Sequence, residues 1–315
     1  MPPTPEPSVL RLGTRGSMLA RTQSQLVADE LERRHPGLRV ELSIFKTSGD
    51  QIADRPLHEL GGKGLFVREL ELALIDGQVD FAVHSYKDVP VTMPLVEQDN
   101  LTVAAVSQRE DARDVLVSSK AKSIAELPQG AVVGTGSLRR RSQLLAARPD
   151  LRIELIRGNI DTRLRKLRGG EFDAIVLALA GIKRAALFDS EVMSPIGIDE
   201  IVPCAGQGIL ALQCRRDDAR TIGYLSVMHH EPSALCAKLE RELVRLLEGD
   251  CHSPIGVGAV VGDGRASLRA AIGRRGGDGP VLRAQGEAAV EEAEGLVQLV
   301  LERLSDENVR AHLHG

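Results

Sequence analysis

The sequence contains few aromatic residues and no long apolar segment. Only 2% of its 315 residues are Phe, Trp or Tyr, and tryptophan is absent. Single-stranded nucleic acids are bound largely by stacking bases on aromatic side chains, so this scarcity argues against such a partner. No apolar run approaches the ~20 residues of a membrane span. The N-terminal stretch MPPTPEPS lacks the basic and apolar parts of a signal peptide.

Cysteine is scarce as well. The four cysteines are Cys204, Cys214, Cys236 and Cys251, and no two of them form a CxxC pair. This spacing favours neither a disulfide framework nor a metal site, and free thiols in a reducing cytoplasm are the simplest interpretation. Cys251 differs from the others, because it lies beside a histidine in the loop sequence GDCHSPIG. From local sequence, an activated thiol and an incidental loop cysteine both remain open there.

The rest of the composition is that of a globular protein. Hydrophobic residues make up 43% of the chain and charged residues 27%, and the length allows two or three domains with full cores. The net charge of −4 provides no general attraction for polyanions. Any site for an anionic ligand must therefore be a local cluster of basic side chains.

The N-terminal third predicts strands that alternate with helices. Strands are expected at residues 9–13 and 40–44, and at the start of the segment VDFAVHSYKDVP (residues 79–90). This β-α-β-α-β rhythm predicts a mostly parallel sheet, in which ligands bind beyond the carboxyl ends of the strands. Lys87 and Asp88 follow such a strand end and are site candidates. The segment by itself favours the alternative, an ordinary solvated ion pair.

Two glycine-containing loops in this region also contain basic residues. Arg15 follows the first expected strand in the sequence GTRGS, and Lys63 lies in the sequence GGKG. A strand, a glycine loop and a helix in succession place backbone N–H groups at the sheet edge. Neither loop fits the GxGxxG or GxxxxGK[ST] pattern, so a nucleotide is weakly supported. Binding an anion and an ordinary surface role remain open for both residues.

In the middle of the chain, basic residues follow three expected strands. The sequence VGTGSLRRR places arginines 139–141 in the first turn of a helix, where the helix dipole disfavours cations. A bound anion would offset this cost, and a basic surface turn is the alternative. Arg157 and Arg163 follow a second strand, and Lys183 and Arg184 a third. Together the three clusters predict a surface that binds carboxylates or phosphates.

The last third predicts a return crossing and a small third domain. The apolar stretch at residues 209–213 is interpreted as a strand that crosses back to the first domain. We therefore expect an α/β protein with two doubly wound domains and a small C-terminal α+β domain with an antiparallel sheet. The predicted division is 1–104 with 203–222, then 105–202, then 223–315.

Several element boundaries are predicted more locally. Strands are expected at 257–261, 266–271 and 280–285, followed by a terminal helix over 288–304. The sequence SIAE at residues 123–126 fits a capping box and predicts the start of a helix.

Eight stretches, in order along the chain, resemble the porphobilinogen deaminase (hydroxymethylbilane synthase) family. They are LGTRGSMLA (12–20), GGKGLFVRELE (61–71), DFAVHSYKDVP (80–90), REDARDVLVS (109–118), VGTGSLRRRSQL (133–144), RGNIDTRLRKL (157–167), AGQGILALQCR (205–215) and GDCHSPIG (249–256). The resemblance implies that the first two domains are similar to periplasmic binding proteins. It also implies that a dipyrromethane cofactor is held by Cys251 through a thioether. Four porphobilinogen molecules would be joined to this primer with loss of ammonia, and linear hydroxymethylbilane would be released.

The resemblance also assigns residues to roles. The family's catalytic aspartate falls on Asp88. Cofactor contacts, besides Cys251, fall on Ser85, Lys87, Thr135, Ser137, Arg139, Arg140 and Lys63. Substrate contacts fall on Arg15, Ser17, Arg157, Arg163 and Arg184. Pyrrole units with acetate and propionate groups need guanidinium partners, and a fixed carboxylate can protonate a leaving amine and stabilise a cation.

One position departs from the family pattern, which often has Thr-Ser-Ser where this chain reads Thr135-Gly136-Ser137. One hydroxyl contact to the cofactor is therefore missing or replaced by backbone. A cytoplasmic monomer without metal, membrane or nucleic-acid partner is expected, with porphobilinogen as substrate. The alternative from another class is a non-catalytic module that binds an organic anion.

Overall fold

The computed structural model describes residues 8–46, 67–91, 100–250 and 253–304, together with 309, 312 and 313. Lys63 and Cys251 lie outside the described residues, so the predictions for these two side chains stay predictions. The chain divides into two compact units, which are described separately. Unit 1 comprises 1–52, 62–108 and 209–234, and unit 2 comprises 53–61, 109–208 and 235–315.

Unit 1 is built on a five-stranded mixed sheet with the order β2-β1-β3-β10-β4. Its strands are β1 (Ser8–Arg15), β2 (Leu38–Phe45), β3 (Phe81–Ser85), β4 (Leu101–Val106) and β10 (Leu210–Arg215). β1 runs parallel to β2 and β3, whereas β10 is antiparallel to both β3 and β4. The sheet is less parallel than predicted, because β10 enters it in the opposite direction after a long excursion of the chain.

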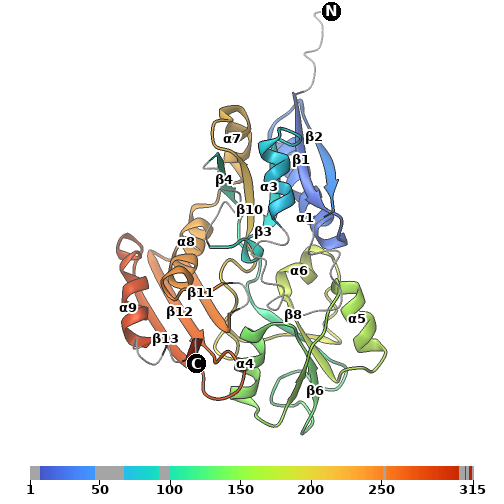
Figure 1. Ribbon diagram of the computed structural model, residues 1–315, viewed down its shortest axis with the longest axis vertical. Coiled ribbons are helices and arrows are strands. Elements are labelled where there is room, and N and C mark those ends of the chain that lie inside the picture. The colour runs from blue at the N-terminus through green and yellow to red at the C-terminus, as the bar shows by residue number, and fades with distance from the viewer. Residues whose placement is uncertain are drawn as a thin grey trace, which may run out of the picture. The chain divides into compact units, whose positions relative to one another are not determined.

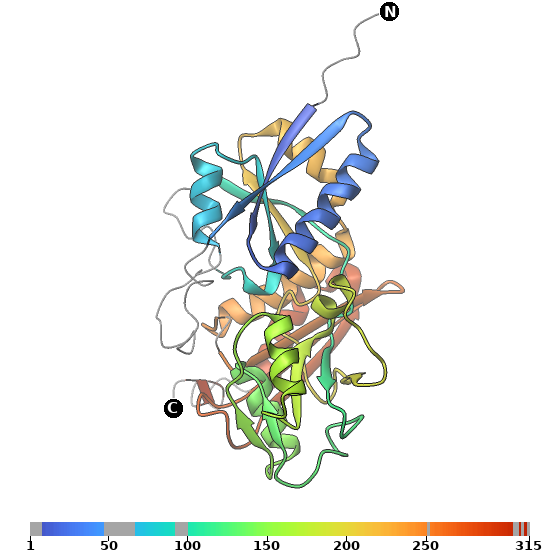
Figure 2. The ribbon, with the colours of Figure 1, turned by 90° about the vertical axis from the view of Figure 1, so that its right-hand side faces the viewer.

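Helices cover both faces of this sheet. Figure 2 shows α1 (Met18–Arg34) on one face and α3 (Arg68–Ile75) on the other. Ser17 begins α1 as its N-cap, and its hydroxyl accepts a hydrogen bond from the Ala20 N–H at 3.3 Å. The Gly13 Cα faces α3, since a Cβ there would lie 3.1 Å from Leu70.

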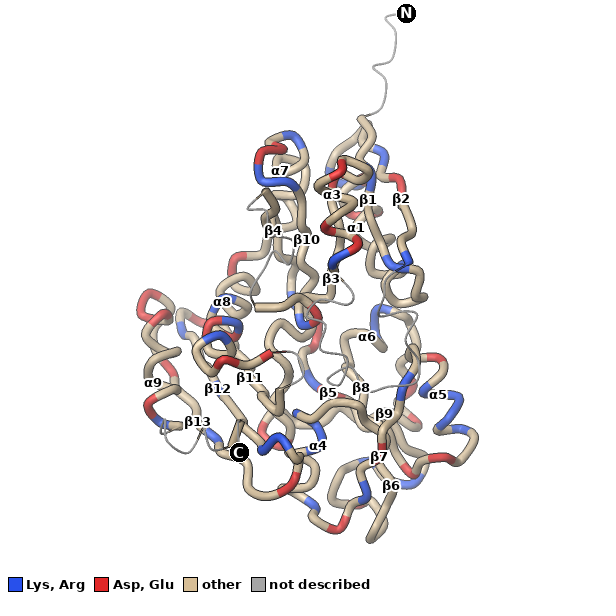
Figure 3. The backbone as a smooth tube through the Cα atoms, viewed as in Figure 1, with Lys and Arg blue, Asp and Glu red and all other residues tan. Residues whose placement is uncertain are grey.

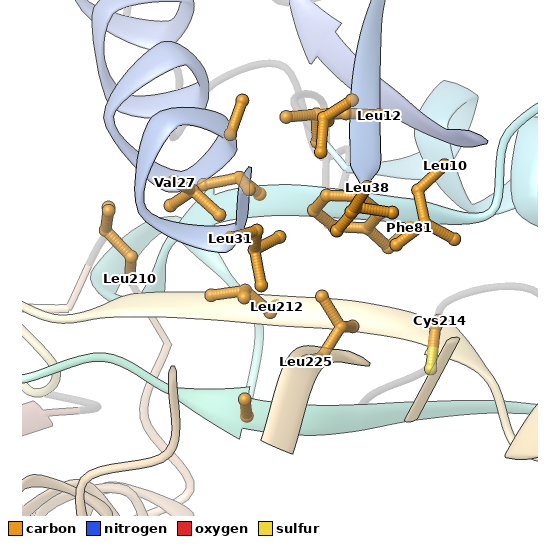
Figure 4. Packing of buried hydrophobic residues seen from close by; sticks show 14 residues of the cluster. Leu10, Leu12, Val27, Leu31, Leu38, Phe81, Leu210, Leu212, Cys214 and Leu225 are labelled. Atoms are coloured by element: carbon orange, nitrogen blue, oxygen red, sulfur yellow. The ribbon is translucent and has the colours of Figure 1, made fainter. Parts of the chain in front are cut away.

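The larger core of unit 1 lies on the α1 face and is entirely aliphatic apart from Phe81 and Cys214 (Figure 4). Leu10, Leu12 and Phe81 from the sheet meet Leu31 from α1, and all four are fully buried. Each buried leucine contributes roughly 1.5–3 kcal/mol. Because the chain has so few aromatic residues, aliphatic side chains supply most of this contact. Side chains alternate along a strand, so His84 of β3 and Gln213 of β10 lie on the opposite face of the sheet.

Unit 2 contains a second mixed sheet, with the order β7-β6-β8-β5-β9. Its strands are β5 (Asp114–Val117), β6 (Val132–Gly134), β7 (Arg152–Glu154), β8 (Ala174–Ala178) and β9 (Met193–Pro195). β6 is parallel to β7 and β8, so the carboxyl ends of these three strands share one edge. The helices that follow them are α4 (Leu138–Ala147), α5 (Ile160–Arg168) and α6 (Leu179–Arg184).

The C-terminal part of the chain forms a three-stranded antiparallel sheet in the order β11-β12-β13. These strands are β11 (Ile255–Gly262), β12 (Arg265–Ile272) and β13 (Leu282–Ala289), and α9 (Gly295–Leu304) packs on β12 and β13 (Figure 1). α7 (Ala219–Leu225) and α8 (Glu231–Leu246) connect β10 to this sheet. The predicted α/β class with a small C-terminal antiparallel sheet is confirmed.

Two local predictions are wrong. The terminal helix does not begin at residue 288, because β13 continues through Ala289 and the helix begins at Gly295. No helix follows the capping-box sequence at 123–126, although the Glu126 N–H does donate to the Ser123 hydroxyl at 3.3 Å. Pro128 and Gly130 follow too closely for a helix to extend.

A buried ion pair holds several segments of unit 2 together. The Arg109 guanidinium donates to Glu240 Oε1 at 2.6 Å from Nη1 and to the Gln207 carbonyl at 2.8 Å from Nε. The Glu240 carboxylate, fully buried on α8, also accepts from the N–H groups of Gly206 and Ala259, both at 2.7 Å. One carboxylate thus satisfies donors from three separate segments.

Replacing Glu240 by glutamine should lower the free energy of unfolding by about 3 kcal/mol, because it leaves the Arg109 charge buried without a counter-charge. Thermal unfolding measures the effect. The matched control is Glu242→Gln on the same helix, where the ion pair with Arg245 is exposed and its loss should hardly change the melting temperature. Equal shifts for the two variants would contradict a special role for Glu240.

Candidate active site

Asp88 lies on a single 3-10 turn, η2 (Tyr86–Asp88), which directly follows β3. The turn is closed by a hydrogen bond from the Val89 N–H to the Tyr86 carbonyl at 3.2 Å. Ser85, the last residue of β3, donates from its hydroxyl to Gln23 Oε1 on α1 at 3.1 Å. Asp88 itself is partly exposed, as a group that must reach a ligand requires.

The neighbouring strand brings Arg15 to the same edge. β1 and β3 are parallel, with Gly13 opposite Ala82, so the end of β1 lies beside the end of β3. Arg15 is the last residue of β1 and Ser17 caps the following helix. The predicted residues of unit 1 that the structure describes, Arg15, Ser17, Ser85, Lys87 and Asp88, therefore follow the carboxyl ends of two adjacent parallel strands.

In unit 2, the hydroxyl groups of the glycine loop after β6 accept hydrogen bonds from nearby backbone N–H groups. Thr135 Oγ1 accepts from the Ser137 N–H at 3.2 Å, and Ser137 Oγ accepts from the Arg140 N–H at 3.4 Å as the N-cap of α4. Gly136 between them is exposed, and a Cβ there would lie 3.3 Å from Leu155 Cδ1 and 3.4 Å from the Ile156 carbonyl oxygen. A larger residue at this position would require its neighbours to shift.

The arginines that begin α4 have an internal partner that the sequence did not suggest. Arg139 donates from Nη1 to Asp114 Oδ2 at 2.8 Å, and Arg140 donates from Nη2 to Asp114 Oδ1 at 2.8 Å. All three side chains are buried. Burial would raise the pKa of the Asp114 carboxyl, but the two guanidinium charges and their hydrogen bonds lower it well below its usual range.

The Asp114 carboxylate therefore offsets much of the electrostatic cost of placing two arginines at the positive end of the helix dipole. Neither alternative drawn from the sequence, a bound anion or a basic surface turn, anticipated this. The cluster still carries a net positive charge, since two guanidinium groups share one carboxylate. Among the described residues, the buried Nε of Arg140 has no hydrogen-bond partner. One donor thus remains for an acceptor that does not belong to the described protein.

The other predicted arginines follow the remaining two strands of the parallel set. Arg157 lies between β7 and α5, and Arg163, in the first turn of α5, donates from Nε to the Gly158 carbonyl at 2.8 Å. Arg184 ends α6 and donates from Nη2 to the Gly208 carbonyl at 2.7 Å. Burial lowers the pKa of Arg184 from its ordinary value. Basic residues are also visible along α5 (Figure 3).

Three polar residues of the site regions were missed in the sequence. Gln207 donates from Nε2 to Asp114 Oδ1 at 2.9 Å and to the Ala112 carbonyl at 2.7 Å. Asp114 opens the buried strand β5, and Gln213 lies inside the buried strand β10. A polar residue beside or inside an apolar strand requires a buried partner. Asp114 at the start of DVLV and Gln213 inside LALQCR therefore could have been recognised from the sequence.

Neither a metal nor a membrane segment is evident in the described part of the chain. Within residues 8–46, 67–91, 100–250 and 253–304, no three His, Cys, Asp or Glu side chains are grouped so that they could hold a metal ion. Among the same residues, no helix is long and apolar enough to cross a membrane. Cys214 and Cys236 are free thiols, and Cys214 lies in the core of unit 1.

Fold and residues together define a class: an α/β protein whose parallel strand ends present arginines, serines and one carboxylate-bearing turn. Within unit 2, the arginines at the strand ends suit a ligand with several carboxylate groups, because each guanidinium can bind a carboxylate through two N–H groups. The donor left over at Arg140 agrees with such a ligand.

The comparisons with known proteins name the family. A model described as the porphobilinogen deaminase dipyromethane cofactor binding domain matches residues 10–223, and one described as the porphobilinogen deaminase C-terminal domain matches residues 234–306. The porphobilinogen deaminase of Sulfurimonas denitrificans is 48% identical over 271 residues, which cover 85% of each chain. The chain belongs to the porphobilinogen deaminase family. It is a transferase with a dipyrromethane cofactor, onto which four porphobilinogen molecules are condensed to give hydroxymethylbilane and ammonia.

Solved structures with a similar course of the chain include two proteins of other kinds. A probable amino-acid ABC transporter extracellular-binding protein from Bacillus subtilis covers 70% of this chain and 90% of its own, with a TM-score of 0.40 and 11% identity. The sulfate-bound regulatory domain of OxyR2 from Vibrio vulnificus covers 71% of this chain and 98% of its own, with a TM-score of 0.41 and 15% identity.

Proposed function

We propose that Asp88 is the acid–base carboxylate of porphobilinogen condensation in this chain and that Cys251 holds the cofactor. The observation that carries the role of Asp88 is its position on a short, hydrogen-bonded turn at the end of a buried strand, partly exposed and beside the end of β1. A carboxylate fixed in this way can donate a proton to a leaving amine and stabilise the positive charge that then develops.

The basic residues are proposed to bind the carboxylates of substrate and cofactor. We assign Arg15, Ser17, Arg157, Arg163 and Arg184 to the substrate. We assign Ser85, Lys87, Lys63, Thr135, Ser137, Arg139 and Arg140 to the cofactor. When bound, the cofactor supplies the primer to which pyrrole units are joined. The shared partner Asp114 holds Arg139 and Arg140 in place, and the free Nε of Arg140 supports its part in this assignment.

The remaining parts of the proposal concern the whole molecule. We propose a cytoplasmic monomer that takes porphobilinogen and binds neither nucleic acid nor membrane. We also propose three domains, comprising 1–104 with 203–222, 105–202 and 223–315. The alternative of a non-catalytic anion-binding module is not favoured, because both family models that match the chain are of porphobilinogen deaminase.

The mass of the intact protein tests the assignment of Cys251. The purified chain should carry a two-pyrrole adduct, and Cys251→Ala should lack both the adduct and the activity. Cys204→Ala is the matched control, since Cys204 lies outside the GDCHSPIG loop and its loss should leave the adduct in place. An active protein without the adduct, or an adduct that persists in Cys251→Ala, would remove Cys251 from the proposal.

A further inference from the structure

A chain of buried polar side chains lies inside unit 1, on the sheet face that packs against α3. His84 Nε2 lies 3.0 Å from Gln213 Oε1, and Gln213 Nε2 lies 2.9 Å from Glu71 Oε1. His84 comes from β3, Gln213 from β10 and Glu71 from α3, and their exposed fractions are 5%, 0% and 0%. Burying three polar side chains costs free energy unless each is hydrogen-bonded, so we expect this group to have a role at the neighbouring strand end.

The acceptor at one end sets the direction of every hydrogen bond. A carboxylate accepts only, so the amide nitrogen of Gln213 must face Glu71, and its carbonyl oxygen must face His84. His84 must then carry a hydrogen on Nε2. Burial, with a smaller contribution from the charge of Arg15 on the adjacent strand, lowers the pKa of His84 to about 4. His84 is thus a neutral imidazole in one tautomer at neutral pH.

This histidine lies two residues before the start of the turn that carries Asp88, with only Ser85 between them. Successive residues of a strand point to opposite faces, so His84 is held on the α3 face while Ser85 is held on the α1 face by Gln23. The next residue is held through its backbone, because the Tyr86 N–H donates to the Ile209 carbonyl at 3.0 Å. The strand end is therefore fixed through three successive residues, and Asp88 follows the last of them by two positions.

We propose that His84 is a positioning residue for Asp88, acting through a hydrogen-bond chain that runs from Glu71 through Gln213. The chain links α3 and β10 to the end of β3 and fixes the direction in which the turn leaves the sheet. Small displacements of a reacting group are costly, and about 1 Å can reduce a rate roughly 100-fold. This inference rests on the proposed role of Asp88.

The test compares two replacements of His84 in the cofactor-loaded enzyme. His84→Leu removes the donor, and kcat should fall about 10- to 100-fold while KM changes little and the adduct mass is retained. His84→Gln keeps an N–H donor that can reach Gln213, and it should recover most of the lost kcat. Cys214→Ala alters a buried residue on the opposite face of β10, so it should lower the melting temperature without lowering kcat.

Ring-nitrogen NMR gives a readout that is independent of turnover. The His84 signal is identified by its loss in His84→Gln, and it should show the Nε2–H tautomer. In Gln213→Glu a carboxylate replaces the amide that faces His84, close to Glu71 and to Arg15, whose charge acts on His84. The pKa of His84 should then rise by more than about one unit.

Each result decides a different point. A wild-type kcat in His84→Leu overturns the positioning role, as does failure of His84→Gln to exceed His84→Leu. If His84→Leu does not fold, the kcat of His84→Gln decides, and a loss as large as that of Asp88→Asn overturns the proposal. An Nδ1–H tautomer overturns the hydrogen-bond chain. Normal turnover in Asp88→Asn would instead refute the proposed function and leave the tautomer result intact.

Discussion

Replacing Asp88 by asparagine should lower kcat about 10²- to 10⁴-fold while leaving the dipyrromethane adduct on the protein. Asparagine has nearly the same shape as aspartate, but it can neither donate a carboxylic proton nor carry the negative charge that stabilises a cationic pyrrole. Because Asp88 is partly exposed on a turn held by backbone hydrogen bonds, the fold should be unaffected. Porphobilinogen consumption and intact mass are the two measurements.

The control for Asp88 is Asp76→Asn, the same chemical change at an exposed residue that ends α3 in the same unit. It should keep normal turnover and an unchanged melting temperature. Near-normal turnover in Asp88→Asn would remove Asp88 from the mechanism. Loss of the adduct together with activity would instead assign Asp88 to cofactor assembly, and the acid–base role would then have no support.

Replacing Asp114 by asparagine should lower the free energy of unfolding by about 3–5 kcal/mol, because it leaves Arg139 and Arg140 buried without their shared counter-charge. Gln207, which also donates to this carboxylate, would lose part of its hydrogen bonding. Denaturant unfolding measures the loss. Asp111→Asn is the matched control, since its partner Arg113 is half-exposed and the effect should be small.

The dependence of stability on pH provides a second measurement for Asp114. The pKa of this carboxyl in the folded protein lies well below its ordinary value of 3.8. When the pH falls toward and below 3.8, the unfolded state binds more protons than the folded state, so stability falls as the pH falls. The stabilisation is fully present above about pH 5 and is lost toward the folded-state pKa. Asp114→Asn should therefore lose stability less steeply at acidic pH than the wild type does, and an unchanged slope would contradict the ion-pair argument.

Local patterns predicted the elements where a short apolar run had clear polar boundaries. The strands expected at 9–13 and 40–44 lie within β1 and β2. The stretch LRAQGEAA of β13 was only partly anticipated, because its alternation is interrupted by Gly286 and its alanines also suit a helix. Gly286 is explained by packing, since a Cβ there would lie 3.0 Å from Leu299 on α9.

The sequence by itself determined the family, the α/β class and the positions of the candidate arginines and Asp88. These depend on ordered motifs and on periodicity within a few neighbouring residues. Only the tertiary structure decided what the buried polar groups do. Arg139 and Arg140 meet Asp114 across 25 and 26 positions, and Gln213 meets Glu71 across 142. Partners so distant are set by strand order and register, and no local pattern encodes which buried charge will find which counter-charge.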